Sequence, residues 1–310
     1  MAAVLIAHAQ FPSAWRAAFE SAFASEGLAL WPTIGDPTRY DCAIVARQEA
    51  GVLSQLPNLR LISSTGMGVD HILGLPDLPR HVPLARVVTQ EMVDQVAEYV
   101  TLAVLRAERE SDWFDDLQRQ GRWERRMTAR PSGKLRIGFL GWGVIAKEAA
   151  RRLIFLGFDV EAWARSARND GDVVVHSGAT GFAAMMARSD VLVCALPSTR
   201  ATANALNAQA LALLPAGAHV VNVGRGEHID DDALLAALDS GRLAGATLDV
   251  FRTEPLPDAH AFWRHPRMRI TPHSAGLLTP SSSAAAILRN LRRVRAGLAP
   301  EHQVKLEAGY

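Results

Sequence analysis

The sequence predicts an α/β fold in which doubly wound parallel sheets are covered by helices on both faces. Short apolar runs alternate with longer helical patterns from one end of the chain to the other. The runs are apolar at successive positions, as in strands that are buried on both faces of a parallel sheet. The length of 310 residues also favours two domains, because about 150 residues is a common domain size.

The expected strands and helices follow one another along the whole chain. The expected strands are Val4–Ala7, Ala43–Ala46, Leu59–Ser63, Leu84–Val88, Leu135–Leu140, Val160–Ala164, Val191–Leu196, His219–Val223, Ala246–Asp249 and Arg269–Thr271. The expected helices are Trp15–Glu26, Glu91–Glu110, Ala146–Leu156, Phe182–Arg188, Ala208–Leu214, Asp231–Ser240 and Pro280–Gly297. This alternation is the pattern of repeated βα units.

Composition argues against several classes of protein. Lys and Arg number 33 and Asp and Glu number 32, so charge gives no reason to expect a nucleic-acid partner or an anionic membrane. Cys42 and Cys194 both lie in apolar runs, which argues against a disulfide framework or a zinc site, and we expect no metal. No apolar run approaches the roughly 18 residues of a membrane helix. The N-terminus lacks the basic start of a signal peptide, so the expected location is the cytoplasm.

The strongest local motif is LRIGFLGWGVIAKEAARRL, an apolar strand followed by a glycine-rich turn and a helical pattern. In this turn Gly141 would allow a sharp bend, Gly143 the approach of a pyrophosphate, and Ala146 close packing of helix on strand. The helix N-terminus would offer free N–H groups to the phosphates. A plain strand–helix turn is the alternative. The expected cofactor contacts are Gly141, Trp142, Gly143, Val144 and Ile145.

The second strand of this region ends in AWARSAR. NAD-binding sites usually place an acidic residue here to hold the ribose hydroxyls, whereas this chain has Ala164. Arg165, Ser166 and Arg168 follow, and two guanidinium groups suit a 2′-phosphate, which Arg binds in a bidentate manner. The motif therefore predicts that NADP(H) is preferred, with NAD(H) possible. Solvated loop arginines are the alternative.

Three later segments carry polar residues in apolar surroundings: VVNVGRGEHIDDDALLAAL, GATLDVFRTEPLP and RITPHSAG. Each follows an expected strand, and open parallel sheets bind ligands at the carboxyl ends of strands. The segments offer Arg225, Glu254 and His273. Reduction of a 2-oxo acid needs a proton donor such as His, a carboxylate beside it, and a guanidinium for the substrate carboxylate and carbonyl. Each residue alone has a structural explanation, but together they predict this chemistry without a metal.

These motifs give the chain a family resemblance. It resembles the D-isomer-specific 2-hydroxyacid dehydrogenases, and most of all their glyoxylate/hydroxypyruvate reductase branch. The resemblance covers nearly the whole chain, with departures at Ala146, at the missing acidic residue and at the bulky Trp142. It rests on the segments Ser64–Leu73, Gly121–Trp123, Gly141–Ala146, Asn222–Gly226, Leu248–Pro257 and Thr271–Gly276.

The resemblance implies roles for individual residues. Arg225 binds the substrate carboxylate and carbonyl, Glu254 pairs with His273, and His273 donates the proton. Backbone amides around Gly66, Met67 and Gly68 hold the substrate carboxylate, with a plain turn as the alternative. The implied cofactor contacts are Leu196, Pro197, Ser198 and Thr202, then Val223, Gly224 and Asp249 nearer the nicotinamide, and His273 and Ala275. For Asp249, a capping or turn role is the alternative.

The resemblance also implies two Rossmann-like domains, one flavodoxin-like and one dinucleotide-binding, with a cleft between them. Residues 1–100 plus 275–310 would form a discontinuous substrate domain, and residues 101–274 the dinucleotide-binding domain. Gly121–Trp123 resembles a segment that reaches toward the partner subunit in family dimers, so a homodimer is expected. A surface loop with one buried Trp is the alternative.

The predicted function is NADPH-dependent reduction of a small 2-oxo acid, such as glyoxylate or hydroxypyruvate, to the 2-hydroxy acid, as the D-isomer where the product is chiral. Two alternatives stay open. The same chemistry could act on bulkier aryl or branched 2-oxo acids, because the sequence does not show the size of the pocket. A nucleotide-sensing binding protein without turnover is less favoured, because the set of Arg225, Glu254 and His273 is complete.

Overall fold

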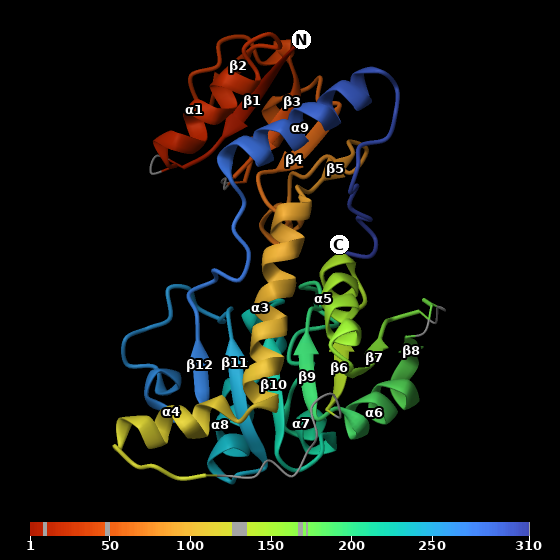
Figure 1. Ribbon diagram of the computed structural model, residues 1–310. Helices are drawn as coiled ribbons and strands as arrows, with labels where there is room; N and C mark the ends of the chain where they lie inside the picture. The colour runs from red at the N-terminus through yellow and green to blue at the C-terminus, as the bar shows by residue number, and fades with distance from the viewer. Residues whose placement is uncertain (9–10, 47–49, 126–134, 167–169, 172, 310) are drawn as a thin grey trace. The chain divides into compact units, whose positions relative to one another are not determined.

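The computed structural model divides into two compact units, each built on one parallel sheet (Figure 1). Unit 1 comprises Met1–Met92 and Leu277–Tyr310, and unit 2 comprises Val93–Gly276. The structure describes residues 1–310 except 9–10, 47–49, 126–134, 167–169, 172 and 310. The predicted α/β class with parallel sheets is confirmed.

The sheet of unit 1 has the strand order β2-β1-β3-β4-β5, and its neighbouring strands are parallel. This is the flavodoxin-like order, as predicted. Its strands are β1 (Ala2–Ile6), β2 (Leu28–Leu30), β3 (Tyr40–Val45), β4 (Leu61–Ser64) and β5 (Leu84–Ala85). Its helices are α1 (Ser13–Ala22), α2 (Asp70–Leu73) and α9 (Pro280–Arg295), with 3₁₀ turns η1 (Pro37–Arg39) and η2 (Leu53–Gln55).

Alternate residues of each strand in unit 1 face opposite sides of the sheet, and both sides are buried. In β1, Ala3 and Leu5 belong to one apolar cluster, and Val4 and Ile6 belong to another. The first cluster includes Phe19 of α1 together with residues of α9, and these two helices pack against each other. Because both faces are covered, the strand is apolar at successive positions, which is the signal in the sequence.

The sheet of unit 2 has the order β12-β11-β10-β9-β6-β7-β8 and is parallel throughout. Counted from β6, this is the dinucleotide-binding order with one further strand at an end. Its strands are β6 (Arg136–Leu140), β7 (Asp159–Trp163), β8 (Val174–His176), β9 (Val191–Cys194), β10 (Ala218–Asn222), β11 (Leu243–Leu248) and β12 (Met268–Ile270). Its helices are α4 (Ser111–Arg119), α5 (Val144–Phe155), α6 (Gly178–Arg188), α7 (Ala208–Leu213), α8 (Asp231–Asp239) and the part of α3 (Gln90–Glu108) after Met92, with 3₁₀ turns η3 (Gly226–His228) and η4 (Ala261–Arg264).

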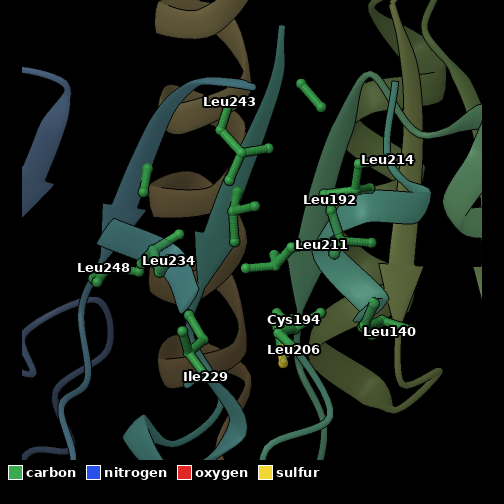
Figure 2. Packing of buried hydrophobic residues seen from close by; sticks show 14 of the residues in the cluster. Leu140, Leu192, Cys194, Leu206, Leu211, Leu214, Ile229, Leu234, Leu243 and Leu248 are labelled. Atoms are coloured by element: carbon green, nitrogen blue, oxygen red, sulfur yellow. The ribbon is translucent and has the colours of Figure 1, made fainter. Parts of the chain in front are cut away.

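The core of unit 2 also lies on both faces of its sheet. Leu140, Leu192 and Cys194 belong to the cluster shown in Figure 2, whereas Phe139, one residue before Leu140, belongs to the opposite cluster. Burial raises the pKa of the Cys194 thiol to about 12, and it also raises the pKa of Cys42. Both cysteines are free and buried, so they serve as apolar core residues.

Four strands and α-helices of the structure are not predicted by the sequence analysis: β2, β8, α2 and α4. The edge strands β2 and β8 have three residues each, none of them buried, so they lack a continuous apolar run. Helix α4 is short and rich in charged residues, and it buries only Leu117. In the described part of the chain, we find no helix with the length and apolar character required to cross a membrane.

Candidate active site

The polar segments of unit 2 leave the sheet along one edge. The strand register aligns the final residues of six neighbouring strands: Trp163, Leu140, Cys194, Asn222, Leu248 and Ile270. The glycine turn, Arg225, Glu254 and His273 all follow these residues in the chain. The edge is therefore the carboxyl edge, where open parallel sheets bind their ligands.

Strand β6 passes into α5 through the predicted phosphate-binding turn. Gly141 has a φ of +93°, and a Cβ there would lie 2.7 Å from the carbonyl oxygen of Ala195, so only glycine fits. A Cβ on Gly143 would meet nothing within 4 Å, which leaves open space over the turn. Val144 is exposed and Ile145 is half-buried. No side chain at Gly143 stands between the backbone and an approaching pyrophosphate, as the motif predicts.

The N-terminus of α5 differs from those of α7 and α8. Asn207 caps α7 and Asp230 caps α8 with a side-chain oxygen. Helix α5 begins after Gly143, and no described residue caps it with a side chain. Its first amide groups and the positive end of its dipole are therefore left for a ligand, which is the arrangement that binds phosphate groups.

The chain after β7 contains two of the residues predicted to bind a 2′-phosphate. Ala164 is buried, whereas Arg165 and Ser166 are exposed. Arg168, the third residue predicted here, lies outside the described residues. The position that usually carries an acidic residue is thus an apolar core residue, followed by exposed cationic and hydroxyl groups.

Trp142 is buried against the sheet, with its ring edge-on to Phe139 at 6.1 Å between ring centroids. Its indole Nε1 donates a hydrogen bond to Oδ2 of Asp170 at 2.7 Å. Asp170 belongs to the connection between β7 and β8. Trp142 therefore links the glycine turn to this connection, a contact that sequence reasoning missed, and its predicted contact with the cofactor stays a prediction.

The loop after β9 holds four predicted cofactor contacts in one compact turn. Leu196 is buried, and Pro197 and Ser198 are half-buried. The hydroxyl of Thr202 donates to the carbonyl oxygen of Pro197 at 2.7 Å and accepts from the amide of Thr199 at 2.9 Å. Thr202 therefore closes the turn, and its contact with a cofactor stays a prediction.

The backbone of Arg225 is held by two buried side chains that sequence reasoning missed. Asn222 donates from Nδ2 to the carbonyl oxygen of Arg225 at 2.9 Å and accepts from the amide of Gly224 at 3.1 Å. The amide of Arg225 donates to Nδ1 of His228 at 3.0 Å. The guanidinium Nη1 donates to the carbonyl oxygen of Gly224 at 2.8 Å. Asn222 and His228 both lie in the segment NVGRGEH together with Arg225. Their closeness to Arg225 in the sequence is the signal that could have found them.

His228 also ties this turn to the loop after β9. Because its Nδ1 accepts a hydrogen bond, its proton is on Nε2, which donates to the carbonyl oxygen of Pro197 at 3.2 Å. Burial lowers the pKa of His228, which favours this neutral ring. Gly224 lies close by, since a Cβ there would be 2.9 Å from the carbonyl oxygen of Leu196. The amide of Val223 donates to the carbonyl oxygen of Cys194 at 3.0 Å, which continues the sheet register.

His273 and Glu254 form a direct pair. Nδ1 of His273 lies 2.8 Å from Oε2 of Glu254, and Oε1 of Glu254 accepts from the amide of Phe251 at 2.9 Å. The His273 side chain is 48% exposed, so the ring is accessible. His273 has a φ of +53°, a conformation that costs a residue other than glycine about 1 kcal/mol or more. The pair expected from the resemblance is therefore present, on a strained backbone.

Asp249 fixes the backbone that carries His273. Its Oδ1 accepts from the hydroxyl of Thr271 at 2.6 Å and from the amide of Ser274 at 2.8 Å, and its Oδ2 accepts from the amide of Ala275 at 3.0 Å. The amide of His273 donates to the main-chain oxygen of Asp249 at 2.8 Å. The buried carboxylate thus has the capping role considered as the alternative, and cofactor contacts of Asp249 and Ala275 stay predictions.

Tyr99 of α3 extends this network and was not found from the sequence. Its hydroxyl lies 2.7 Å from the hydroxyl of Thr271. Because the proton of Thr271 goes to the Asp249 carboxylate, Tyr99 is the donor in this contact. Burial raises the pKa of Tyr99 to about 12, so the phenol keeps its proton at neutral pH.

The predicted substrate turn in unit 1 follows β4. The amide of Gly66 donates to Oγ of Ser64 at 3.2 Å, and the Ser64 hydroxyl donates to the carbonyl oxygen of Gly68 at 2.9 Å. The carbonyl oxygen of Gly66 accepts from the amide of Val87 at 3.0 Å. No described residue accepts a hydrogen bond from the amides of Met67 or Gly68. These two amides are the donors that the turn offers to an anion.

The sequence model of the D-isomer specific 2-hydroxyacid dehydrogenase NAD binding domain matches residues 101–275. The chain belongs to the D-isomer specific 2-hydroxyacid dehydrogenase family. The family resemblance predicted from the sequence is therefore confirmed. Among curated members, glyoxylate/hydroxypyruvate reductase A of Serratia proteamaculans is 40% identical over 281 residues, which cover 89% of this chain and 90% of the relative.

Solved structures of family members have the same fold. A D-isomer specific 2-hydroxyacid dehydrogenase from Xanthobacter autotrophicus Py2, in complex with NADPH and MES, has a TM-score of 0.93 and 35% identity, covering 100% of this chain and 99% of that one. An NADPH-dependent glyoxylate/hydroxypyruvate reductase from Sinorhizobium meliloti, in complex with NADP and sulfate, has a TM-score of 0.92 and 32% identity, covering 100% of both chains. The Rossmann-like architecture predicted for the family is thus confirmed.

Proposed function

We propose that the protein reduces a small 2-oxo acid, of the glyoxylate or hydroxypyruvate type, to the 2-hydroxy acid with NADPH, and to the D-isomer where the product is chiral. The observation that carries the proposal is the 2.8 Å pair of His273 and Glu254, which lies at the carboxyl edge of the same sheet as the glycine turn. Relatives named glyoxylate/hydroxypyruvate reductase support the substrate class.

The geometry assigns each acid–base group a role. Nδ1 of His273 keeps a proton against the Glu254 carboxylate, so Nε2 is the atom that gives a proton to the substrate oxygen. Glu254 orients the ring and balances the charge of the imidazolium. Arg225 binds the substrate carboxylate through its planar guanidinium and polarises the carbonyl group. Bound NADPH supplies the hydride.

Within unit 1, we assign the amides of Met67 and Gly68 to the substrate carboxylate. Gly66 shapes the turn, since its own amide is engaged by Ser64. Unit 1 is accordingly the proposed substrate domain and unit 2 the proposed dinucleotide-binding domain. The unit boundaries at residues 92 and 277 lie near the 100 and 275 expected from the sequence.

The residues of unit 2 fit a dinucleotide with a 2′-phosphate. The uncapped N-terminus of α5 and the open space over Gly143 suit the pyrophosphate. Arg165, Ser166 and Arg168 are the proposed 2′-phosphate ligands, with NAD(H) as a weaker alternative cofactor. The relatives crystallised with NADPH and NADP support this preference.

We further propose a cytoplasmic homodimer. Trp123 is 92% exposed, so the alternative of a surface loop with a buried Trp does not apply to this structure. Exposed aromatic side chains are enriched in surfaces that another subunit covers. Light scattering after size exclusion should give twice the mass of one chain, and Trp123→Ser should shift the protein toward the monomer. A monomeric wild-type protein would contradict the dimer.

The decisive experiment measures NADPH oxidation with glyoxylate, hydroxypyruvate, pyruvate and phenylpyruvate side by side. The proposal expects the highest kcat/KM for glyoxylate or hydroxypyruvate. A higher value for phenylpyruvate would favour the reductase of bulkier acids. Tight NADPH binding without turnover of any 2-oxo acid would favour the nucleotide-sensing protein.

A further inference from the structure

The connection between β7 and β8 is anchored to the glycine turn through one carboxylate. Nε1 of Trp142 donates to Oδ2 of Asp170 at 2.7 Å, and Nζ of Lys147 lies 2.5 Å from the same oxygen. Trp142 lies between the two glycines of the turn, and Lys147 lies in the first turn of α5. Asp170 therefore joins the chain that follows Arg165 and Ser166 to the proposed phosphate-binding turn.

The two partners of Asp170 contribute unequally. The Lys147 and Asp170 side chains are 46% and 33% exposed, and ion pairs so exposed to solvent contribute little. The indole of Trp142 is buried and fixed by its contact with Phe139, so the direction of its N–H is set by the core. A hydrogen bond from a buried donor to a carboxylate is charge-assisted and stronger. Of the two partners, Trp142 therefore contributes more to holding Asp170 in place.

The described residues of this connection include two backbone contacts, one at Ala164 and one at Asp170. At one point, the amide of Ala164 donates to the carbonyl oxygen of His176 in β8 at 2.9 Å. At the other, Asp170 pairs with Val173, whose amide donates to the carbonyl oxygen of Asp170 at 3.3 Å. The exposed residues Arg165 and Ser166 lie in the chain between these two points. Their placement consequently depends on where Asp170 is held.

We propose that Trp142 is a positioning residue for cofactor selectivity: by holding Asp170 it places Arg165 and Ser166 to receive the 2′-phosphate of NADPH. The physical gain is preorganisation, because long side chains on a fixed backbone lose less conformational entropy when they bind a phosphate. The inference rests on the proposed preference for NADPH. It adds a residue outside the phosphate contacts that sets the strength of that preference.

The test compares binding of NADP⁺ and NAD⁺ by isothermal titration calorimetry, without substrate. Trp142→Phe keeps an aromatic ring on Phe139 but removes the N–H donor. The Kd for NADP⁺ should rise about tenfold, as for loss of a hydrogen bond to a charged group, whereas the Kd for NAD⁺ should stay within about twofold. The matched control is Trp263→Phe, which removes an indole donor bonded to Pro257 and should change neither Kd.

A second variant keeps the test independent of packing around Trp142. Asp170→Ala removes the same bond from its other end and should weaken NADP⁺ binding selectively. In the double variant the two losses should not add, because each removes one shared interaction. Equal weakening of both nucleotides, unchanged NADP⁺ binding, or additive losses would overturn the inference.

The wild-type protein separates this inference from the proposed function. Equal wild-type affinities for NADP⁺ and NAD⁺ would refute the proposed NADPH preference and, with it, this role of Trp142. A wild-type preference for NADP⁺ that survives unchanged in Trp142→Phe and Asp170→Ala would refute the role of Trp142 alone.

Discussion

The two edges of the unit 2 sheet carry polar groups in contrasting environments. At the carboxyl edge, His273 and Glu254 are partly exposed, and His273 has a left-handed backbone. At the amino edge, Asp190 accepts hydrogen bonds from the amide, Nε and Nη2 of Arg136 at 3.1 to 3.3 Å. His219 is buried at the start of β10.

The comparison distinguishes groups proposed to act on a ligand, at the carboxyl edge, from groups that stabilise the folded chain, at the amino edge. At the amino edge, Asp190 accepts hydrogen bonds from Arg136, and Nε2 of His219 lies 2.9 Å from the hydroxyl of Thr247 in the neighbouring strand β11. At the carboxyl edge, His273 keeps an accessible ring and a strained backbone, which folding alone does not require. We therefore expect matched substitutions at the two edges to affect different quantities: activity at the carboxyl edge and stability at the amino edge.

The largest effect is expected for His273→Gln. Glutamine cannot give up a proton, so kcat should fall by about 10²–10⁴. The matched control is His219→Gln at the amino edge, which should leave kcat at neutral pH unchanged. Steady-state kinetics with NADPH and glyoxylate measure both variants, and equal activities in the two variants would contradict the comparison.

Asp249→Asn should have the next largest effect. Its amide nitrogen cannot accept the hydrogen bond from Ser274 or Ala275, so kcat should fall about 10- to 100-fold and the free energy of unfolding by about 1–3 kcal/mol. Asp190→Asn makes the same change at the amino edge and should lower only the free energy of unfolding. Kinetics and urea unfolding distinguish the outcomes, and loss of activity in Asp190→Asn alone would reverse the assignment of the two edges.

His219 predicts a pH dependence of stability. Burial lowers its pKa to about 4, with smaller effects from Asp112, which raises it, and from Arg269 and Arg106, which lower it. The unfolded chain, with a His pKa of about 6.5, binds the proton first as pH falls. Stability from this group is therefore present above about pH 6.5 and lost as pH falls toward 4.

The measurement is urea unfolding at neutral pH and near pH 5. Between these conditions the wild type should lose about 2 kcal/mol more than His219→Gln does, since the variant lacks the titrating group. The same loss in both proteins would show that His219 is not the group responsible.

Tyr99→Phe should have the smallest effect. It removes the donor to Thr271, so the free energy of unfolding should fall by about 1 kcal/mol. The kcat should fall by a few-fold, because His273 would be positioned less precisely. Because the pKa of Tyr99 is raised to about 12, its hydroxyl does not titrate near neutral pH. The shape of the pH profile of kcat should therefore be unchanged, and a shifted profile would indicate a direct role in proton transfer. Tyr40→Phe, which loses a bond to the Ile34 carbonyl, is the control for stability alone.

Residues whose local chemistry is distinctive were predictable from the sequence. Gly141 was recognised because a strand, a sharp turn and a helix follow one another there, and the structure gives it the positive φ that such a turn requires. The pair of His273 and Glu254 was predictable because residue type and family pattern agree. The parallel strands were predictable because burial on both faces makes them apolar throughout.

Residues that act through distant partners were not predictable. Asn222, His228 and Tyr99 look like ordinary core or helix residues in the sequence, and their roles depend on partners brought close by the fold. For Asp249 the sequence left a cofactor contact and a capping or turn role open, and the structure engages both of its oxygens with the segment that carries His273. Short edge strands such as β2 were not predicted, because a half-buried strand has no continuous apolar run.

The sequence alone determined the α/β class, the alternation of buried strands with helices and the residue types proposed for the chemistry, because these depend on local pattern. Only the tertiary structure decided which side chains hold the reacting groups in place. Trp142 meets Asp170, and Tyr99 meets Thr271, because sheet register and helix packing bring together segments that are remote in the chain. Such contacts leave no periodicity or spacing in the sequence, since each depends on the whole fold that surrounds it.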